Sequence, residues 1–266
     1  MNITNLFNLS LKLYDAGLLL KEWSSYVKYK KWNKMAARNR ELAGYKTSSK
    51  CYVCGNGPSL KKVDFDSLDG DTIVLNAYWR IASNFKKKPT FYMLNDEAYG
   101  YEDWCKENMI GLLKCYPEVP HVLSSKLGPA VDSKFSEYKA NVYYYNPTGR
   151  TYKHKYRIDF TKCTFYTWNV VTSAIQLAIY AGYKEIYLLG CDYSLFASRY
   201  VSHVYDQDGE KIECKIKLRD MLYKYVFTTH IHYEVAQYAK EHGVKIVNLT
   251  SETLLDAYEI DPNSKY

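Results

Sequence analysis

The sequence predicts an α/β fold in which a mostly parallel β-sheet carries helices on both faces, preceded by a helical extension. The first observation is that short apolar segments alternate with longer helical patterns from residue 51 onward. The second is that glycine or polar residues directly follow several of the apolar segments, as at the end of a strand. The third is a globular composition over 266 residues, 47% hydrophobic and 24% charged. This length suffices for one large domain with an extension.

Residues 1–48 are expected to form a basic, amphipathic helical extension. In its first half, apolar residues recur near helical spacing, at Leu6, Leu9, Leu13, Leu20 and Trp23. Its second half interleaves six Lys/Arg with Tyr26, Tyr29 and Trp32. The first 50 residues hold ten Lys/Arg and three Asp/Glu, which accounts for the whole net charge of +7. This pattern predicts attachment to an anionic membrane surface through residues 5–40, or an arm that packs on the body or on another subunit.

Residues 49–266 are expected to form the body, after a linker at 44–50. The expected strands are 50–54, 72–76, 90–94, 121–124, 142–145, 185–190 and 245–249, and the expected helices are 101–108, 170–182 and 218–242. Residues 51–266 hold 26 basic and 26 acidic residues, which argues against a nucleic-acid-binding surface. In such sheets, ligands bind beyond the carboxyl ends of the strands.

Cysteine usage and hydropathy indicate a cytoplasmic protein. The seven cysteines are an odd number, as expected for free thiols in a reducing compartment. Cys51 and Cys54 lie on one expected strand, where their side chains would point to opposite faces, so a zinc or redox site is not expected. No run of eighteen apolar residues exists, and the expected location is the inner face of the cell membrane.

A glycine-rich turn follows the first expected strand. It reads Gly55, Asn56, Gly57, Pro58 and Ser59. Such a turn can bring bare backbone N–H groups against a phosphate, or it can be an ordinary strand-to-loop turn. The sequence is neither a Walker motif nor GxGxxG. It indicates a nucleotide or another phosphorylated ligand.

Asparagines stand at three further positions near strand or helix ends. Asn76 closes the second expected strand and Asn95 the third, where an amide can bind a base or a ribose, or simply start a turn. Asn169 precedes the helix that ends at Gly182. As an N-cap, Asn169 would leave free N–H groups for an anion, although a purely structural cap fits equally well.

The late strand and the histidines supply the other candidates. Gly190, Asp192 and Tyr193 follow the strand at 185–190, and no second carboxylate forms a DxD arrangement there, so no metal is inferred. A base for a hydroxyl acceptor is usually a histidine or a carboxylate. His203 and His230 are the better candidates because both could lie above the strand ends, whereas His232 lies on a different face of its helix.

These motifs resemble those of two related groups of bacterial proteins. GNGPSL after the first strand, Asn76 after the second, and AGYKEIYLLGCDYS after a helix are similar to the sialyltransferase family that includes the Campylobacter enzymes. They are also similar to a broader set of Maf-like and pterin-pyrophosphokinase-like proteins. The resemblance covers about residues 50–255.

The resemblance implies a Rossmann-like, metal-independent glycosyltransferase without a further cofactor. Its donor would be a CMP-activated nonulosonic acid such as sialic acid, and its acceptor a hydroxyl of a bacterial surface glycan or glycolipid. The implied nucleotide-binding positions are Gly55, Asn56, Gly57, Pro58, Ser59, Asn76, Asn95, Asn169, Gly190 and Asp192. The implied catalytic candidates are His203, His230 and Tyr193. A homo-oligomer stays open.

The chain also departs from the sialyltransferase pattern. Those enzymes have Thr-Ser where this chain has Asn169 and Val170, which puts the contacts to the sugar carboxylate in doubt. The paired tyrosines that bind phosphate do not map cleanly, because Tyr193 is followed by Ser194; Tyr200 or Tyr205 could serve instead. The family histidine aligns near Val226, so His230 fits only with a local shift, and His203 fits the broader set better.

Two other functions are compatible with the sequence. A pterin-pyrophosphokinase-like enzyme would need Mg²⁺ and several carboxylates around a triphosphate, with Asp192 and Asp96 as candidates. A non-catalytic nucleotide-binding scaffold at the membrane would bind nucleotide without turnover.

Overall fold

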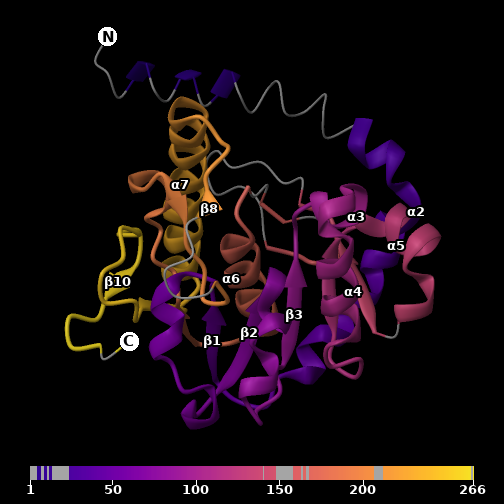
Figure 1. The fold of residues 1–266 in the computed structure, drawn as a ribbon, viewed down its shortest axis with the longest axis horizontal. Coiled ribbons are helices and arrows are strands. Elements are labelled where there is room, and N and C mark those ends of the chain that lie inside the picture. Colours follow the sequence, from indigo (N-terminus) through magenta and orange to yellow (C-terminus); the bar gives the residue numbers. More distant parts are fainter. Residues whose placement is uncertain are drawn as a thin grey trace.

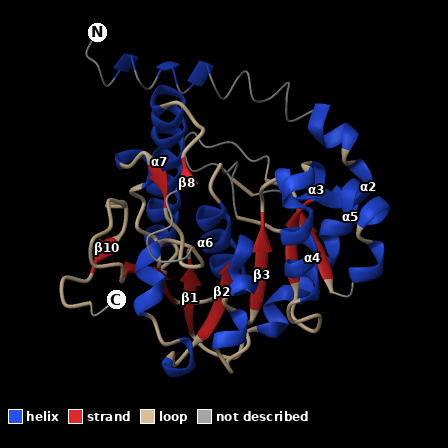
Figure 2. Ribbon diagram, viewed as in Figure 1, coloured by secondary structure: helices blue, strands red, loops and turns tan. Residues whose placement is uncertain are grey.

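The chain forms one eight-stranded, fully parallel sheet with helices on both faces, as seen in the computed structural model (Figures 1 and 2). The structure describes residues 5–6, 9–10, 12–13, 24–139, 141–147, 158–162, 164–165, 168–206, 212–264 and 266. The strand order is β10-β9-β6-β1-β2-β3-β4-β5. The order reverses between β1 and β6, because the chain moves outward from β1 to β5 and then returns to the other side of β1. The predicted fold class is confirmed.

The strands of the sheet agree with the expected ones to within a residue at each end. They are β1 (Lys50–Cys54), β2 (Asp71–Leu75), β3 (Phe91–Leu94), β4 (His121–Ser124), β5 (Val142–Tyr145), β6 (Glu185–Leu189), β9 (Lys245–Asn248) and β10 (Glu259–Ile260). The sequence did not predict β10, nor the antiparallel pair of β7 (Tyr200–Val201) and β8 (Ile212–Glu213). Each of these three strands has only two residues.

The helices are more numerous and often shorter than expected. The α-helices include α2 (Lys30–Met35), α3 (Ala98–Tyr101), α4 (Lys106–Lys114), α5 (Gly128–Lys134), α6 (Val170–Ala181) and α7 (Leu218–Glu241). Short 3₁₀ helices span Ala36–Tyr45, Pro58–Lys62, Phe65–Ser67, Asn76–Arg80, Ala82–Asn84, Asp103–Cys105, Ser125–Leu127, Ser136–Tyr138 and Leu195–Ala197. The expected helix at 101–108 was misplaced: only its last three residues belong to α4, whose buried residues Met109, Leu112 and Leu113 lie beyond it.

Two hydrophobic cores lie on opposite faces of the sheet. Helices α6 and α7 cover one face, where Ile175 and Ile231 pack on the strands. Helices α4 and α5 cover the other face, where Met109 and Val131 are buried. Cys51 belongs to the first core and Cys54 to the second, as the strand alternation predicts. Among the described residues, no helix is both long and apolar enough to cross a membrane.

Residues 24–45 of the extension pack against the far edge of the body. Nε1 of Trp32 donates to Oδ2 of Asp132 at 3.1 Å, and Nζ of Lys31 reaches the same oxygen at 2.6 Å. Gly128 lies directly against the Trp32 ring, where a Cβ atom would come within 2.2 Å of it. The buried side chain of Asn39 donates to the carbonyl oxygens of Tyr144 and Phe160, both at 2.8 Å.

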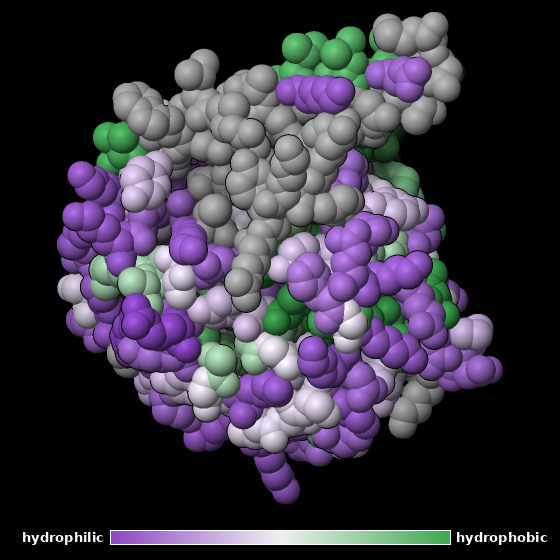
Figure 3. Space-filling view, turned by 180° about the vertical axis from the view of Figure 1, so that it is seen from behind, coloured by the Kyte–Doolittle hydropathy of each residue, from purple (hydrophilic) through white to green (hydrophobic). Residues whose placement is uncertain are grey.

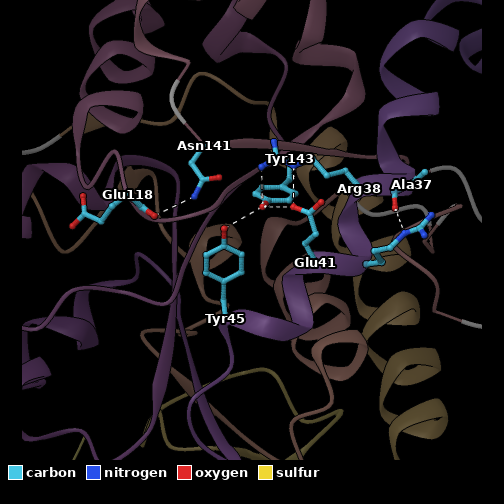
Figure 4. Close-up of polar contacts among 8 residues, drawn as sticks. Ala37, Arg38, Glu41, Tyr45, Glu118, Asn141 and Tyr143 are labelled. Carbon is cyan, nitrogen blue, oxygen red and sulfur yellow. Dashed lines mark hydrogen bonds and ion pairs between the residues drawn. The ribbon is translucent and has the colours of Figure 1, made fainter.

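A second group of contacts fixes the end of the extension on β5 (Figure 4). Nη2 of Arg38 donates to the hydroxyl of Tyr143 at 3.1 Å, and that hydroxyl lies 3.1 Å from both Glu41 and the hydroxyl of Tyr45. Residues 24–45 therefore form an arm packed on the body, one of the two arrangements that the sequence left open. The attachment of this arm to a membrane stays a prediction.

The expected linker is tied to the amino end of the sheet. The carboxylate of Asp71, at the start of β2, accepts hydrogen bonds from the backbone N–H and the hydroxyl of Thr47, the N–H of Ser48 and the hydroxyl of Tyr183. Burial by itself would raise the pKa of this carboxyl, but the four hydrogen bonds outweigh it and lower the pKa below 3.8. The Asp71 carboxylate therefore connects the arm to the sheet.

Candidate functional site

A cavity of about 370 Å³ lies at the carboxyl ends of the strands, where the strand order reverses between β1 and β6. This is the position at which parallel sheets bind ligands. Ten predicted residues contribute to its wall: Gly55, Asn56, Gly57, Pro58, Asn76, Asn169, Gly190, Asp192, Tyr193 and His203. Residues that are more than a hundred positions apart in the chain thus meet at one place.

The two glycines of the turn are required by the close approach of the segment after β6. A Cβ atom on Gly57 would lie 1.8 Å from Oδ2 of Asp192, and one on Gly55 would lie 2.4 Å from the carbonyl oxygen of Gly190. Ser59 does not line the cavity: its hydroxyl donates to Oδ2 of Asp192 at 2.8 Å. Asp192 therefore holds the turn in place.

The backbone N–H groups of this turn are mostly occupied, which corrects the expectation that they are bare. The N–H of Gly55 donates to Leu189 at 2.7 Å and that of Gly57 to Gly190 at 2.9 Å. The N–H of Ser59 donates to Asp192 at 3.3 Å, and Pro58 has none. The expected phosphate cradle is absent from residues 55, 57 and 59 because the segment after β6 takes these donors.

The amino-terminal end of helix α6 lies on the same wall. Oδ1 of Asn169 accepts from the N–H of Val171 at 2.8 Å, so Asn169 is the predicted N-cap. The helix ends at Gly182, whose φ of 89° is left-handed, also as predicted. The first N–H groups of a helix have no partner within it, and Val170 and Val171 line the cavity. The partial positive charge of this helix end favours an anion.

Asn56, in the glycine-rich turn, and Asn76, directly after β2, have side-chain amide oxygens without a partner among the described residues. Nδ2 of Asn56 donates to the carbonyl of Leu75 at 3.0 Å, whereas Oδ1 of Asn56 and Oδ1 of Asn76 have no partner among the described residues. Asn76 adopts a left-handed conformation with φ of 48°, which asparagine tolerates better than most residues. The hydroxyl of the buried Tyr92 donates to the Asn76 carbonyl at 2.7 Å and fixes this strand end.

The predicted histidines lie on different sides of the site. His203 lines the cavity, its ring stacks on Tyr205, and its Nδ1 lies 3.3 Å from Oδ2 of Asp206. A carboxylate beside one ring nitrogen orients an imidazole for proton transfer at the other. His230 does not line the cavity but a neighbouring groove, with Nε2 3.8 Å from Oε1 of Glu234.

His232, which the sequence placed on a different face, is the second histidine that lines the cavity. It is fully buried and contributes to the cavity wall. Nδ1 of His232 lies 2.9 Å from the hydroxyl of Tyr258, and Nε2 has no partner among the described residues. Burial lowers the pKa of this imidazole to about 3, so it is neutral at physiological pH. Only the tertiary structure shows that this histidine is buried beside the cavity.

Tyr193 connects the cavity to α7. Its hydroxyl lies 2.7 Å from the hydroxyl of Thr228 and 3.0 Å from that of Thr229, and its ring meets the His232 ring edge to face at 5.4 Å. Burial raises the pKa of the Tyr193 phenol. Tyr200, one of the two alternative tyrosines, also lines the cavity, whereas Tyr205 does not.

A second depression of about 610 Å³ continues from the cavity and contains the last predicted residue. Asn95 lies in it, together with Asn76, Asn169 and Tyr193, which both depressions share. Among the described residues, no group of three His, Cys, Asp or Glu side chains could hold a metal ion. The shared residues place Asn95 next to the cavity rather than in its wall.

The fold resembles those of solved glycosyltransferases at low sequence identity. The MAf glycosyltransferase from Magnetospirillum magneticum AMB-1 is 12% identical, with a TM-score of 0.53 over 88% of this chain and 39% of that chain. The Campylobacter jejuni sialyltransferase CstII in complex with cytidine-5′-monophosphate is 18% identical, with a TM-score of 0.45 over 82% of this chain and 86% of that chain. The sialyltransferase Cst-I from Campylobacter jejuni is 15% identical, with a TM-score of 0.42 over 79% of each chain.

These likenesses concern the fold. Both groups that the motifs resemble, the Campylobacter sialyltransferases and the Maf-like proteins, are among the structural neighbours. No protein-family model matches the sequence, and no curated protein matches it.

Proposed function

We propose that the chain is a metal-independent glycosyltransferase that moves a CMP-activated nonulosonic acid, such as sialic acid, to a hydroxyl of a bacterial glycan or glycolipid. The observation that carries this proposal is the cavity at the reversal of strand order: Asn56 and Asn76 contribute to its wall, and their buried amide oxygens have no partner among the described residues. An amide next to a cavity can bind a base or ribose through a donor and an acceptor together. The motif resemblance supplies the donor class.

The helix end, rather than the glycine turn, is the better place for the donor phosphate. Val170 and Val171 at the start of α6 line the cavity, and although Asn169 caps the N–H of Val171, the partial positive charge of the helix end remains. The N–H groups of Gly55, Gly57 and Ser59, in contrast, donate within the fold. The hydroxyl of Tyr200, also on the cavity wall, could add a further donor. Donors already in place stabilise the charge that develops on a leaving phosphate.

The transfer needs one base, and His203 fits this role. The acceptor oxygen forms a bond to the anomeric carbon, the bond from that carbon to the phosphate oxygen breaks, and CMP leaves with the electron pair. The acceptor proton passes to Nε2 of His203, while Asp206 at Nδ1 stabilises the imidazolium that forms. His230 lacks a place in the cavity and is the weaker candidate.

The first test is ligand-dependent melting, followed by turnover. A ligand that binds the native state raises the melting temperature. We expect CMP to stabilise the chain equally in EDTA and in Mg²⁺, and CMP-sialic acid to release CMP when a glycan acceptor is present. His203→Ala is expected to lower kcat by roughly 10²- to 10⁴-fold, as for the loss of a general base, whereas the matched control His230→Ala keeps activity.

Each other outcome points to a different function. Stabilisation only by UDP or GDP sugars would keep a transferase and replace the donor. Stabilisation only by ATP with Mg²⁺ would indicate the pyrophosphokinase-like reaction. Binding of CMP without any turnover, and without an effect of either histidine variant, would indicate a nucleotide-binding scaffold.

A further inference from the structure

The amino-terminal part of α7 and the three residues before it expose an unusual number of apolar side chains. Leu218 is 59% exposed and Tyr223 is 61% exposed, and Ile216, Leu222 and Val226 are each more than 40% exposed. Leu218, Leu222 and Val226 recur every four residues, so they form one stripe along the helix. We call residues 215–226 the α7 face. Apolar groups clustered on a surface usually mark a contact with a partner or a membrane.

Basic residues accompany this stripe. The α7 face contains Lys215, Lys217, Arg219 and Lys224 against one acidic residue, Asp220, although residues 51–266 as a whole have no net charge. All four basic side chains are exposed. Arg219 pairs with Asp220 at 3.0 Å, whereas the three lysines have no carboxylate partner among the described residues. Exposed apolar and aromatic groups flanked by lysine are typical of helices that lie on anionic lipid.

The α7 face borders the candidate site. Ile216 and Lys224 line the second depression, the one that contains Asn95, together with Asn76 and Asn169. Leu222 and Val226 line an apolar groove of about 620 Å³, which shares Tyr193 and Tyr225 with the cavity. In Figure 1 the start of α7 lies at the same end of the molecule as residues 5–6, 9–10 and 12–13, whose leucines are exposed. Seen from behind, the mainly hydrophilic surface also carries separate apolar patches (Figure 3).

The arm is a poorer candidate for such a contact. Of its basic and aromatic residues, Tyr29 is buried, Trp32 and Lys31 contact Asp132, and Arg38 contacts Tyr143. Each of these side chains contacts the body, although Lys31 and Arg38 remain largely exposed. What remains exposed on the arm includes Tyr26, Val27 and Met35 together with Lys30, Lys34 and Arg40, so the arm has fewer exposed apolar side chains than the α7 face.

We propose that the α7 face docks on an anionic phospholipid surface and holds the open side of the site toward it. The basic residues would attract the lipid headgroups, and the leucine stripe would enter the headgroup boundary. This surface goes beyond the proposed transferase activity and does not depend on which ligand the cavity binds. It would bring a lipid-linked hydroxyl to the mouth of the cavity.

The test is sedimentation of the full chain with vesicles. One set contains phosphatidylcholine and phosphatidylglycerol, and the other contains phosphatidylcholine alone. We expect binding to the anionic set only, and a variant with Lys215→Gln, Lys217→Gln and Arg219→Gln to bind roughly a hundredfold more weakly. The matched control replaces Lys30, Lys34 and Arg40 with Gln, again two lysines and one arginine, and is expected to bind as the unmodified chain does.

A second variant tests the apolar stripe. Leu218→Ser with Leu222→Ser retains every charge and is expected to weaken vesicle binding by roughly tenfold or more. Unchanged melting temperatures would confirm that all variants fold, and an unchanged response to CMP would separate this result from a failure of the proposed activity.

Three results would overturn the proposal. One is that the unmodified chain does not bind anionic vesicles. Another is that vesicle binding falls as much in the arm control as in the α7 variant. The third is that the unmodified chain is an oligomer, that the leucine variant is a monomer, and that vesicles bind neither of them. The α7 face would then be an interface between copies of the chain.

Discussion

The two ends of the sheet differ in whether their buried polar groups have hydrogen-bond partners. At the amino end, the carboxylate of Asp71 receives four hydrogen bonds. At the carboxyl end, Oδ1 of Asn56, Oδ1 of Asn76 and Nε2 of His232 have no partner among the described residues. An unpaired buried polar group costs about 1–3 kcal/mol. The difference indicates that the amino end is built for stability and that the carboxyl end keeps groups available for a ligand.

Asp71→Ala gives the largest expected effect at the amino end. It leaves the donors of Thr47, Ser48 and Tyr183 without an acceptor, and we expect a loss of roughly 3 kcal/mol of unfolding free energy. Because folding lowers the pKa of Asp71, its stabilisation is present above the unfolded pKa near 3.8 and disappears as the pH falls through the folded pKa. Urea unfolding at several pH values measures both effects.

Asp69→Ala is the matched control at the same end of the sheet. Asp69 is 61% exposed and pairs with Lys50 at the surface, so a loss below about 1 kcal/mol is expected. Equal losses for the two variants, or a loss of CMP binding in Asp71→Ala without destabilisation, would contradict the assignment of a structural role to this end.

His232→Gln gives an intermediate effect with a characteristic pH dependence. The folded pKa of about 3 lies below the unfolded value of 6.5, so only the unfolded chain takes up a proton between them. Stability is therefore fully present above pH 6.5 and falls as the pH is lowered toward 3. Between pH 7 and pH 5 the unmodified chain should lose about 2 kcal/mol relative to the variant.

Denaturant unfolding at the two pH values, together with titration of CMP, tests this prediction. If Nε2 of His232 serves a ligand, the variant also binds CMP or the CMP sugar more weakly. If the variant has the same pH dependence of stability and the same affinity for CMP as the unmodified chain, His232 neither sets the pH dependence of stability nor contacts the ligand.

Asn76→Gly is expected to have the smallest effect on stability and a clear effect on binding. Glycine adopts the left-handed conformation of residue 76 freely, so the strand end keeps its backbone while the amide is lost. We expect roughly tenfold weaker CMP binding, about 1.4 kcal/mol. Asn76→Ala removes the same amide but strains the backbone by about 1–2 kcal/mol. Calorimetric titration and thermal melting of the two variants separate the effect of backbone strain from the loss of the amide. An unchanged CMP affinity in Asn76→Gly would show that the Asn76 amide does not contact the ligand.

The sequence predicted the central part of the fold because each strand is short, apolar and ended by glycine or a polar residue. Helix α6 was predictable from local signals alone, since Asn169 caps it and Gly182 ends it. The helix at α4 was misplaced because Gly111 lies within it, against the ring of Trp79, and that contact is invisible along the chain.

The candidate site was predicted as a set of positions and less well as chemistry. Ligands bind beyond the carboxyl ends of parallel strands, and this rule correctly predicted that Gly57, Asn76 and Asp192 lie at one cavity. It could not show that Gly190 and Asp192 occupy the turn's N–H groups, because that contact joins residues 133 apart. His232 was missed for the same reason, since its burial depends on how α7 meets the sheet.

The reversal of strand order has a consequence for how the protein is made. One edge of β1 pairs with β2, but its other edge pairs with β6, whose residues Glu185–Leu189 are synthesised more than a hundred positions later. Until they leave the ribosome, the nascent chain exposes the open edge of an apolar strand at its centre. Such edges recruit other chains. Fragments that end before β6 are therefore expected to aggregate, and the nascent chain should depend on chaperones until that strand is complete.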